Sequence, residues 1–422
     1  MIQLPYLREN KELINERYSK RNLDASVTID QILALDEARK STQQEMDTQL
    51  AEANKLAKQI GELFKSGKAS EANELKEVSK SLKESATVLK DKLKEIEEEQ
   101  TQLLYQLPNV PNEKVPTGKS DEDNEIIFTK GEPTTFSHEA LPHWDLASKH
   151  GLIDFETGVK ITGAGFPLYQ GKGAKLQRAL INFFLDEAEK AGYEEVIPPH
   201  VVNEASGIGT GQLPDKEGQM YYIGADDLYL IPTAEVPITN IYRDEIVNAA
   251  SFPIKNCGYT PCFRREAGSY GKDVRGLNRL HQFDKVEIVQ ITHPSKSESA
   301  LEEMKDHIKN LLEKLGLHYR VALLCGGDLG FAASITYDFE VYSAAQEKWL
   351  EVSSVSNFET YQANRLKLRF KNEEGKTELA HTLNGSALAL PRILAAILEN
   401  NQTEEGINIP EVLIPYTKFD KI

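Results

Sequence analysis

Apolar residues recur at steps of three and four over residues 28–104, a stretch without proline that contains two glycines, Gly61 and Gly67. This spacing is typical of two helices packed along a narrow seam. Thr28, followed by Gln31, can form a capping box at the start of the first helix. A polar break at residues 66–68 is short enough to force the two helices antiparallel. The apolar positions predicted for the seam are Met46, Leu50, Ala53, Ala57, Ile60, Phe64, Leu75, Val78, Leu82, Leu89, Ile96 and Leu103.

A proline-rich stretch with Pro108, Pro111 and Pro116 follows this helical pattern. Proline disrupts a helix interior, so this stretch predicts the end of the second helix and a linker. We therefore expect a helical-hairpin domain at residues 1–106 and a second domain at residues 107–422. Periodicity alone does not distinguish a spacer or an oligomerisation element from an arm that reaches a partner.

Beyond the linker, polar and apolar residues alternate, which predicts strands. Strands are expected at residues 283–291, 337–342 and 348–355, and a further hairpin at residues 366–371 and 377–382. Consecutive hairpins imply an antiparallel sheet, not the parallel sheet of a Rossmann or P-loop enzyme.

Amphipathic helices at residues 174–191 and 386–400 are expected to flank this sheet. The predicted fold class is α+β, with an N-terminal antiparallel helical hairpin followed by an antiparallel sheet flanked by helices. No GxxxxGK[ST] or GxGxxG motif stands at a strand-to-helix turn. Any nucleotide must therefore be held by side chains, chiefly arginines.

The acidic composition limits the class of partner. The net charge is −17, whereas proteins that coat nucleic acid are usually basic. Residues 1–105 carry 17 Lys and Arg against 20 Asp and Glu, so most of the negative charge belongs to the remainder. If the protein binds a polyanion, we therefore expect the first contact at the N-terminal part.

Cysteine content and hydropathy indicate the compartment. Cys257, Cys262 and Cys325 are too few for a disulfide framework and lack the spacing of a zinc site. Residues 1–10 lack the apolar run of a signal peptide. No window approaches the ~18 apolar residues of a membrane span. We expect a cytoplasmic protein without zinc and without a membrane partner.

The densest polar segment runs from Cys262 to Glu287. Two arginines and a glutamate end its first strand, a loop with Gly268, Gly271 and Gly276 follows, and a second strand returns. A loop rich in glycines and cations between two strands suits a phosphorylated ligand that the backbone approaches closely.

This segment resembles motif 2 of class II aminoacyl-tRNA synthetases, in the form FRxEAGSxGxDxRGLxRxHQFxKVE of seryl-tRNA synthetases. Residues 383–389, followed by Arg392, are similar to motif 3. Residues 233–235 (Thr-Ala-Glu) resemble the serine-contacting segment of that family, and residues 351–354 (Glu-Val-Ser-Ser) its E[IV]SS segment. The resemblance covers essentially the whole chain and implies an ATP-dependent serine–tRNA ligase.

The resemblance also implies the residues of the ATP site. Negative charge accumulates on the α-phosphorus when a serine carboxylate attacks it, so fixed cations are the main need. Arg264 and Arg392 match the catalytic arginines, the first on the α-phosphate and the serine carboxylate, the second on the γ-phosphate. The implied ATP-binding residues are Arg264, Arg265, Glu266, Arg279, Phe283, Glu351, Val352, Ser353, Ser354 and Arg392.

Within this set the resemblance assigns individual contacts. Glu266 matches the glutamate at the adenine amino group, Phe283 the ring that stacks on adenine, and Arg279 the arginine on its other side. Glu351 and Ser354 match the oxygen ligands of Mg²⁺. No general base is needed, because the attacking carboxylate is already ionised at pH 7.

Two residues depart from the family pattern. Arg265 stands where the family usually has a small residue, and its side chain either points to solvent or adds a phosphate contact. Pro391 stands where glycine is common, and inside a helix it could kink the chain and shift Arg392.

The implied serine site explains selection among small amino acids. A carboxylate placed on the substrate hydroxyl is left unpaired by alanine, a penalty that can reach ~10⁴-fold. Threonine must be excluded by lack of room for its methyl group. The implied serine-binding residues are Thr233, Ala234, Glu235, Arg264, Glu287 and Ser386.

The resemblance also names partners. The helix at residues 174–191, followed by residues 196–199 (Val-Ile-Pro-Pro), resembles motif 1, which implies a homodimer. The hairpin arm implies binding of tRNA(Ser), and of tRNA(Sec). The alternatives are a related ligase that loads a carrier protein, whose known forms lack the arm, and a non-catalytic interaction protein. Prolyl and threonyl synthetases share the core but not the hairpin.

Overall fold

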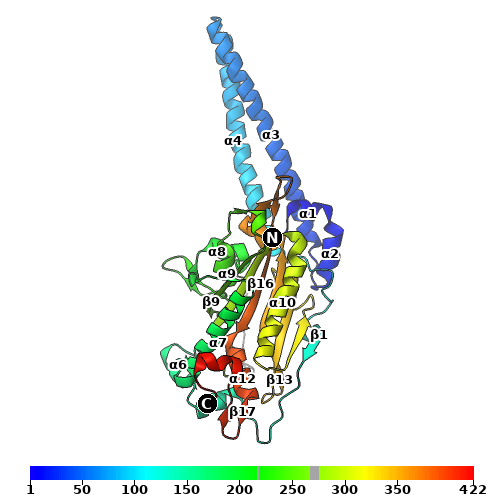
Figure 1. Ribbon diagram of the computed structural model, residues 1–422. Helices are drawn as coiled ribbons and strands as arrows, with labels where there is room; N and C mark the ends of the chain where they lie inside the picture. The colour runs from blue at the N-terminus through cyan, green and yellow to red at the C-terminus, as the bar shows by residue number, and fades with distance from the viewer. Residues whose placement is uncertain (216–217, 267–274) are drawn as a thin grey trace. The chain divides into compact units, whose positions relative to one another are not determined.

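A computed structural model describes residues 1–215, 218–266 and 275–422 of the chain (Figure 1). Contacts between residues divide it into two units. The first, which we call the body, comprises Met1, Arg17–Leu23 and Asn109–Ile422; the second, the arm, comprises Ile2–Glu16 and Asp24–Pro108. The domain division predicted at residue 106 stays a prediction.

The arm is an antiparallel pair of long helices, as predicted. Helices α3 (Ser26–Lys65) and α4 (Ala69–Gln106) are joined by a short turn in which Gly67 adopts a φ of +76°. That left-handed conformation favours glycine, which explains the polar break in the pattern. Two short helices, α1 (Leu4–Glu9) and α2 (Lys11–Ser19), precede the pair.

The start of α3 and part of its seam differ from the prediction. The helix begins at Ser26, with Ala25 as a cap that has no side-chain acceptor, so Thr28 lies inside the first turn. Four of the predicted seam residues, Leu50, Ala57, Phe64 and Val78, are exposed instead. Small side chains take up much of the helix contact, which moves the larger apolar residues outward. The buried residues of α4 are Ala72, Ser79, Ala86, Leu89, Leu93, Ile96, Gln100 and Leu104.

The body is built on an eight-stranded sheet. All its neighbouring strands pair antiparallel except β4 and β9, which pair parallel. The predicted α+β class with an antiparallel-rich sheet is therefore confirmed. In spatial order the strands are β1 (Glu125–Lys130), β11 (Tyr319–Leu323), β12 (Ile335–Ser343), β13 (Lys348–Glu359), β16 (His381–Ala389), β10 (Gln282–Thr292), β9 (Ile254–Phe263) and β4 (Glu194–Glu195).

Helices α7 (Gly171–Lys190), α10 (Ser297–Lys314) and α12 (Leu390–Asn400) pack against this sheet and bury the main apolar core (Figure 1). Val286 and Ile288 of β10 belong to that core. Because neighbouring strand residues point to opposite faces, Glu287 between them points to the other face of the sheet. The hydrophobic core therefore fixes the strand that presents this carboxylate.

Smaller elements complete the body. Among the residues that the structure describes, the body also contains the α-helices α5 (His143–Lys149), α6 (Phe155–Ile161), α8 (Glu204–Thr210), α9 (Glu235–Asn240), α11 (Thr360–Leu366) and α13 (Ile414–Thr417). The small sheets pair β2 (Ile153–Asp154) with β3 (Leu168–Tyr169), β17 (Gln402–Thr403) with β18 (Gly406–Ile407), β7 (Leu228–Leu230) with β5 (Val201–Val202) and β6 (Tyr222–Ile223), and β14 (Arg369–Lys371) with β15 (Thr377–Leu379) and β8 (Ile246–Val247).

Two predicted boundaries near the C-terminus are wrong. Ser386 lies in β16, and the helix predicted from it begins at Leu390. Pro391 occupies the first turn of α12, where its missing N–H costs nothing, so it starts the helix rather than kinking it. The strand predicted at 366–371 begins only at Arg369, because α11 ends at Leu366 and Lys367 caps it with a φ of +53°.

In the part of the chain that the structure describes, no helix is long and apolar enough to cross a membrane. All three cysteines are free and buried.

Candidate active site

The serine-binding residues proposed from sequence surround a buried ion pair on β10. The Lys285 ammonium lies 2.6 Å from the Glu287 carboxylate, and both side chains are almost fully buried. Lys285 also donates a hydrogen bond to Thr233 Oγ1 at 2.8 Å. On the neighbouring strand, Ser386 pairs in register with Glu287. Thr233, Glu287 and Ser386 are thus brought together although they are distant in sequence.

A second buried carboxylate, Glu235, begins α9 directly after buried Ala234. Its Oε1 atom accepts a hydrogen bond from Gln362 Nε2 at 2.6 Å, and Gln362 in turn accepts one from the Thr382 hydroxyl at 2.7 Å. Burial, and then the nearby Glu287 carboxylate, raise the pKa of Glu235 to about 7. Two neighbouring buried carboxylates favour a cationic or hydrogen-bond-donating ligand.

Arg264 follows the end of β9 and faces both parts of the site. Its Nε donates to the Pro232 carbonyl at 3.3 Å, beside Thr233. Its guanidinium lies 5.2 Å from the centre of the Phe283 ring. Arg264 is therefore placed between the serine-binding segment and the residues proposed for adenine.

The residues proposed for adenine lie on the paired strands β9 and β10 and at their ends. Phe283 pairs in register with Cys262, and its side chain is partly buried against the core. Arg279 and Glu266 form an ion pair at 3.0 Å. The Phe283 ring offers a face on which a base can stack, and the Arg279–Glu266 pair supplies polar groups near the ends of the same two strands.

Arg392, in the first turn of α12, is fixed against two segments. Its Nε donates to the Asn278 carbonyl at 3.2 Å, and its Nη1 donates to the Glu351 carbonyl at 2.7 Å. The same Nη1 lies 3.4 Å from the Glu351 carboxylate. The turn segment that leads into β10, the start of α12 and β13 therefore meet at this arginine.

Glu351 and Ser354 of β13 are three residues apart, which in a regular strand places them on opposite faces. A bulge opposite Phe339 and Glu340 leaves Val352 without a partner between Glu351 and Ser353. Glu351 and Ser354 then both interact with the same residue, Asp338. Burial and the Glu351 carboxylate raise the pKa of Asp338, and Ser354 hydrogen-bonds to it.

This bulge offers a carboxylate and a hydroxyl, which are oxygen donors suited to Mg²⁺. Among the described residues no group of three or more His, Cys, Asp or Glu could hold a metal ion. A cation here would therefore need further oxygens from a ligand, such as nucleotide phosphates. Ser353 next to them donates its hydroxyl to the Ser386 carbonyl at 2.6 Å, which ties β13 to β16.

Two predicted features are placed differently from the rest. The Arg265 side chain is exposed, and its backbone N–H donates to the Gln219 carbonyl at 2.9 Å. Gly268 and Gly271 of the predicted phosphate loop lie outside the described residues.

Sequence reasoning missed Lys285 and Gln362. Lys285 neutralises Glu287, and Gln362 orients Glu235. The period of two along β10 could have found Lys285, because it places residues 285 and 287 on one face. Gln362 gave no such signal, since it reaches the site from α11, 127 residues away from Glu235.

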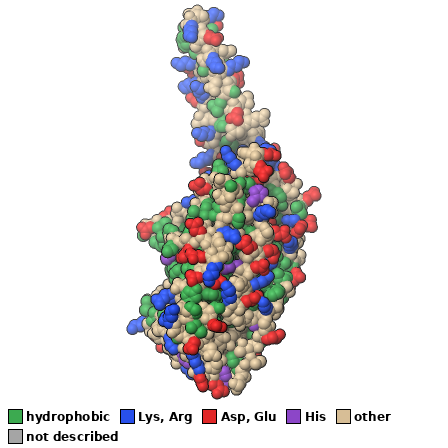
Figure 2. All heavy atoms as spheres, in the orientation of Figure 1, with side chains coloured by type: hydrophobic (Ala, Val, Ile, Leu, Met, Phe, Trp, Pro, Cys, Tyr) green, Lys and Arg blue, Asp and Glu red, His purple; other side chains and the backbone are tan. Residues whose placement is uncertain are grey.

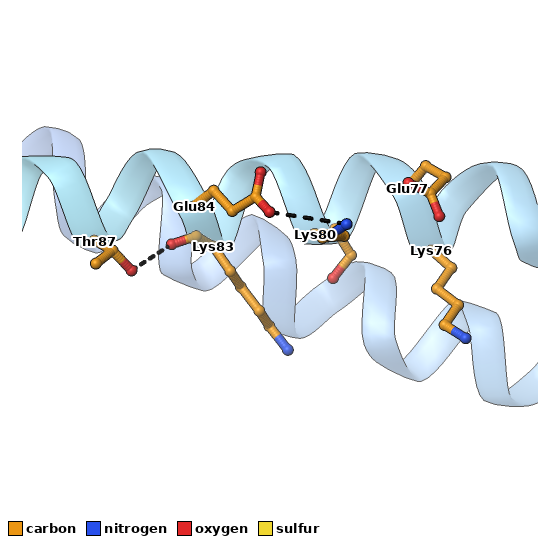
Figure 3. A pocket seen from close by; sticks show the side chains of 7 residues that line it. Lys76, Glu77, Lys80, Lys83, Glu84 and Thr87 are labelled. Atoms are coloured by element: carbon orange, nitrogen blue, oxygen red, sulfur yellow. Dashed lines mark hydrogen bonds and ion pairs between the residues drawn. The ribbon is translucent and has the colours of Figure 1, made fainter.

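On the arm, charged side chains of α4 line a pocket (Figure 3). Lys76 and Lys83 extend from the same side of the helix, while Glu84 turns toward Lys80, 3.9 Å away. Lys and Arg side chains also occur along the rest of the arm surface (Figure 2). These cations are solvated, unlike Lys285.

Two family models match the chain. Residues 1–111 match the seryl-tRNA synthetase N-terminal domain. Residues 222–401 match the class II tRNA synthetase core domain of the G, H, P, S and T group.

Similar proteins match over the full length. The chain is 50% identical to the serine–tRNA ligase of Salinibacter ruber, covering 100% of this chain and 99% of that protein. It is 47% identical to the serine–tRNA ligase of Chlorobium chlorochromatii, with both chains covered completely. The crystal structure of seryl-tRNA synthetase from Pyrococcus horikoshii complexed with ATP superposes with a TM-score of 0.93 at 34% identity, covering 100% of this chain and 99% of that one. The chain therefore belongs to the seryl-tRNA synthetase family.

Proposed function

We propose that this protein is a serine–tRNA ligase that works in two steps. A serine carboxylate oxygen attacks the α-phosphorus of ATP, the bond to the bridging oxygen breaks, and pyrophosphate leaves. A hydroxyl of the terminal adenosine of tRNA(Ser), or of tRNA(Sec), then attacks the carbonyl carbon of the seryl-adenylate formed in the first step, and AMP leaves. The observation that carries the proposal is the buried cluster of Glu235, Glu287, Lys285 and Thr233 next to Arg264.

The charges of this cluster suit zwitterionic serine. Arg264 takes the carboxylate, while the ammonium and the hydroxyl are met by the carboxylates of Glu235 and Glu287. Thr233, Ala234 and Ser386 form the remaining walls. Lys285 offsets the charge of Glu287 at 2.6 Å, so the cluster does not hold two uncompensated carboxylates. An alanine would leave a buried acceptor unpaired, which is the basis of selection.

ATP is bound at the other side of Arg264. Phe283 stacks on adenine, Arg279 lies on the other side of the base, and Glu266 accepts from the adenine amino group. Arg264 and Arg392 hold the phosphates, and exposed Arg265 adds to the positive field. Because these cations are anchored by backbone carbonyls, they need little reorganisation as charge develops on phosphorus.

Glu351 and Ser354 would hold Mg²⁺ together with the phosphates, with Val352 and Ser353 forming the strand beneath. When bound, the cation would neutralise charge on the phosphates. The bulge that turns residues 351 and 354 toward Asp338 supports this assignment.

The arm binds the tRNA. Its length and its exposed cations on α4, among them Lys76, Lys80 and Lys83, suit contact with a phosphate backbone outside the adenylate site. A net charge of −17 for the whole chain makes a local patch necessary for such a partner.

The active form is a homodimer joined through α7 and the segment after it. Ile197 in that segment leaves 85% of its surface exposed, which supports an apolar contact there. The three free cysteines support a reducing, cytoplasmic compartment.

Transfer of labelled serine to purified tRNA(Ser) tests the proposal. The protein should charge tRNA(Ser) in the presence of ATP and should leave a tRNA for another amino acid uncharged. Equal charging of both tRNAs, or charging without ATP, would overturn it.

A further inference from the structure

The body contains a fully buried histidine that none of the assigned roles uses. His143 begins α5, and its side chain has no exposed surface. Its Nε2 atom accepts a hydrogen bond from the backbone N–H of Leu277 at 2.8 Å, and its Nδ1 atom lies 2.7 Å from Glu399 Oε1. The ring therefore connects the segment that enters β10 with the C-terminal part of α12.

These two contacts determine the proton of the ring. Because Nε2 accepts from Leu277, it carries no proton, so the neutral ring holds its proton on Nδ1 and donates it to Glu399. A side chain in this place must thus accept on one side and donate on the other. Simple packing would not require this polarity.

Glu399 collects donors from three separate elements. It accepts from the backbone N–H of His143 at 2.8 Å, from its Nδ1–H, from Gln346 Nε2 at 2.7 Å and from the Ser343 hydroxyl. The carboxylate is completely buried. A buried ionic group is weak evidence for stability, since apolar packing often does as well. Its value here is that it holds α5, the β12–β13 turn and α12 in one arrangement.

From this carboxylate a chain of contacts leads to Arg392. Gln346 accepts from Asn278 Nδ2 at 3.1 Å, and the Asn278 carbonyl accepts from Arg392 Nε at 3.2 Å. Asn278 is therefore held on one side by Gln346, and on the other it fixes the guanidinium. Leu277, its neighbour, is the residue that His143 anchors.

The approach of the backbone to this histidine is unusually close. A Cβ atom on Gly276 would lie 2.3 Å from His143 Nε2, and the φ of +69° at Gly276 also favours glycine. The adjoining Arg275 guanidinium lies 4.9 Å from the Trp144 ring centre. Arg275 and Leu277 are thus contacted by α5 and Asn278 by the β12–β13 turn, while Gly276 leaves no room for a side chain beside His143.

We propose that His143, with Glu399 and Gln346, positions residues 277–278 and through them the Arg392 guanidinium for the distal phosphates of ATP. His143 is a positioning residue, because it touches neither substrate. The inference rests on the phosphate-binding role proposed above for Arg392.

The test compares the affinity for ATP with that for AMP, which lacks the distal phosphates. His143→Leu removes both the acceptor and the donor. Its dissociation constant for ATP should rise about tenfold, the scale of an orphaned buried group, while that for AMP should change less than about twofold. His143→Gln keeps an acceptor for Leu277 N–H and should recover ATP affinity to within about threefold. Calorimetric titration measures both nucleotides, and KM for serine in pyrophosphate exchange should stay unchanged.

Two further variants distinguish the possible failures. His307→Leu removes another buried histidine, on α10, and serves as the control for a general loss of core stability. Arg392→Ala tests the underlying role and should weaken ATP but spare AMP. If Arg392→Ala weakens both nucleotides equally, the phosphate role fails and the inference falls with it. If Arg392→Ala weakens ATP more than AMP but His143→Leu does not, the positioning inference alone is wrong. The same holds if His143→Leu and His307→Leu change the two dissociation constants to the same extent.

Discussion

Charged side chains lie in opposite environments in the body and in the arm. In the body, Lys285 and Glu287 pair at 2.6 Å with side-chain exposures of 7% and 1%. On the arm, Lys80 and Glu84 lie 3.9 Å apart with exposures of 66% and 69%. Coulomb interactions are much stronger in the buried site than in water, so the interaction energy of the Lys285–Glu287 pair depends strongly on its geometry. The Lys80–Glu84 pair is weakened by the screening of solvent and salt.

This difference indicates which residues determine substrate specificity. Loss of one partner of a buried pair leaves an uncompensated charge, so each residue of the body site has a large individual effect. On the arm the shape of the helix pair is fixed by small residues in the seam, and the surface cations act together. Body variants should therefore change the chemical step, and arm variants should change RNA binding.

The largest effect is expected from Arg264→Ala. This change removes a preorganised cation beside the serine-binding segment, and adenylate formation should slow by roughly 10²–10³-fold. Pre-steady-state measurement of adenylate formation gives this rate directly. A rise in KM for ATP at unchanged rate would mean that Arg264 contributes only uniform binding.

Shortening the arm should separate the two steps of the reaction. Ser79 and Gln100 of α4 hydrogen-bond to Ala53 and Ile32 of α3, which gives the register of the helix pair. Deleting residues 44–88 and closing the gap with a short turn therefore shortens both helices equally. Serine activation should persist, while charging of tRNA(Ser) falls about tenfold or more and loses part of its salt dependence.

The deletion keeps the base of the arm, where Arg8 and Lys40 each lie 3.0 Å from buried Asp36. Charging is compared at equal adenylate-forming activity. Unchanged charging by the shortened protein would show that the distal arm is a spacer.

Glu235 should make stability depend on pH. Its folded pKa of about 7 lies above the ordinary 4.5, because of burial and the Glu287 carboxylate. Between these values the unfolded chain releases the proton while the folded protein keeps it, so stability falls as pH rises. The Glu235→Gln side chain cannot ionise. Between pH 5 and 7.5 the free energy of unfolding of this variant should therefore fall by ~1–3 kcal/mol less than that of the parent protein. Urea unfolding at both values measures this, with the exposed Glu84→Gln as control. Equal losses in parent and Glu235→Gln would contradict the assignment.

The smallest effect is expected from single arm cations. Lys80→Ala removes an exposed ion pair and should leave the unfolding midpoint unchanged. If Lys80 contacts a tRNA phosphate, the slope of log affinity against log salt should decrease by about one. A loss of serine activation in this variant would contradict the division of roles between arm and body.

Much of the fold could be predicted because its patterns are local. The helix pair follows from apolar spacing and from the break at Gly67, and the β12–β13 hairpin from alternation on both sides of a polar turn. The end of β16 could not be located in this way. Ala387–Ala389 are apolar and suit a strand or a helix equally, and Pro391 is compatible with a helix only in its first turn.

The site was predictable only where its residues belong to a recognisable motif. Gln362 and Asp338 reach it from α11 and β12, and no sequence pattern connects them with Glu235 or Ser354. The strand order of the sheet brings them there, and that order follows from long-range packing. The bulge at Val352, which turns Glu351 and Ser354 toward one residue, likewise leaves no trace in a single sequence.

The most direct test of the central claim is amino-acid-dependent exchange of labelled pyrophosphate into ATP, measured with each of the twenty amino acids. The cluster of Thr233, Glu235, Glu287 and Ser386 predicts that serine supports exchange, whereas alanine, glycine and threonine support very little. Glu287→Gln should reduce exchange with serine and narrow its advantage over alanine. Equal rates with serine and alanine for the unaltered protein would contradict the claim that this site selects serine.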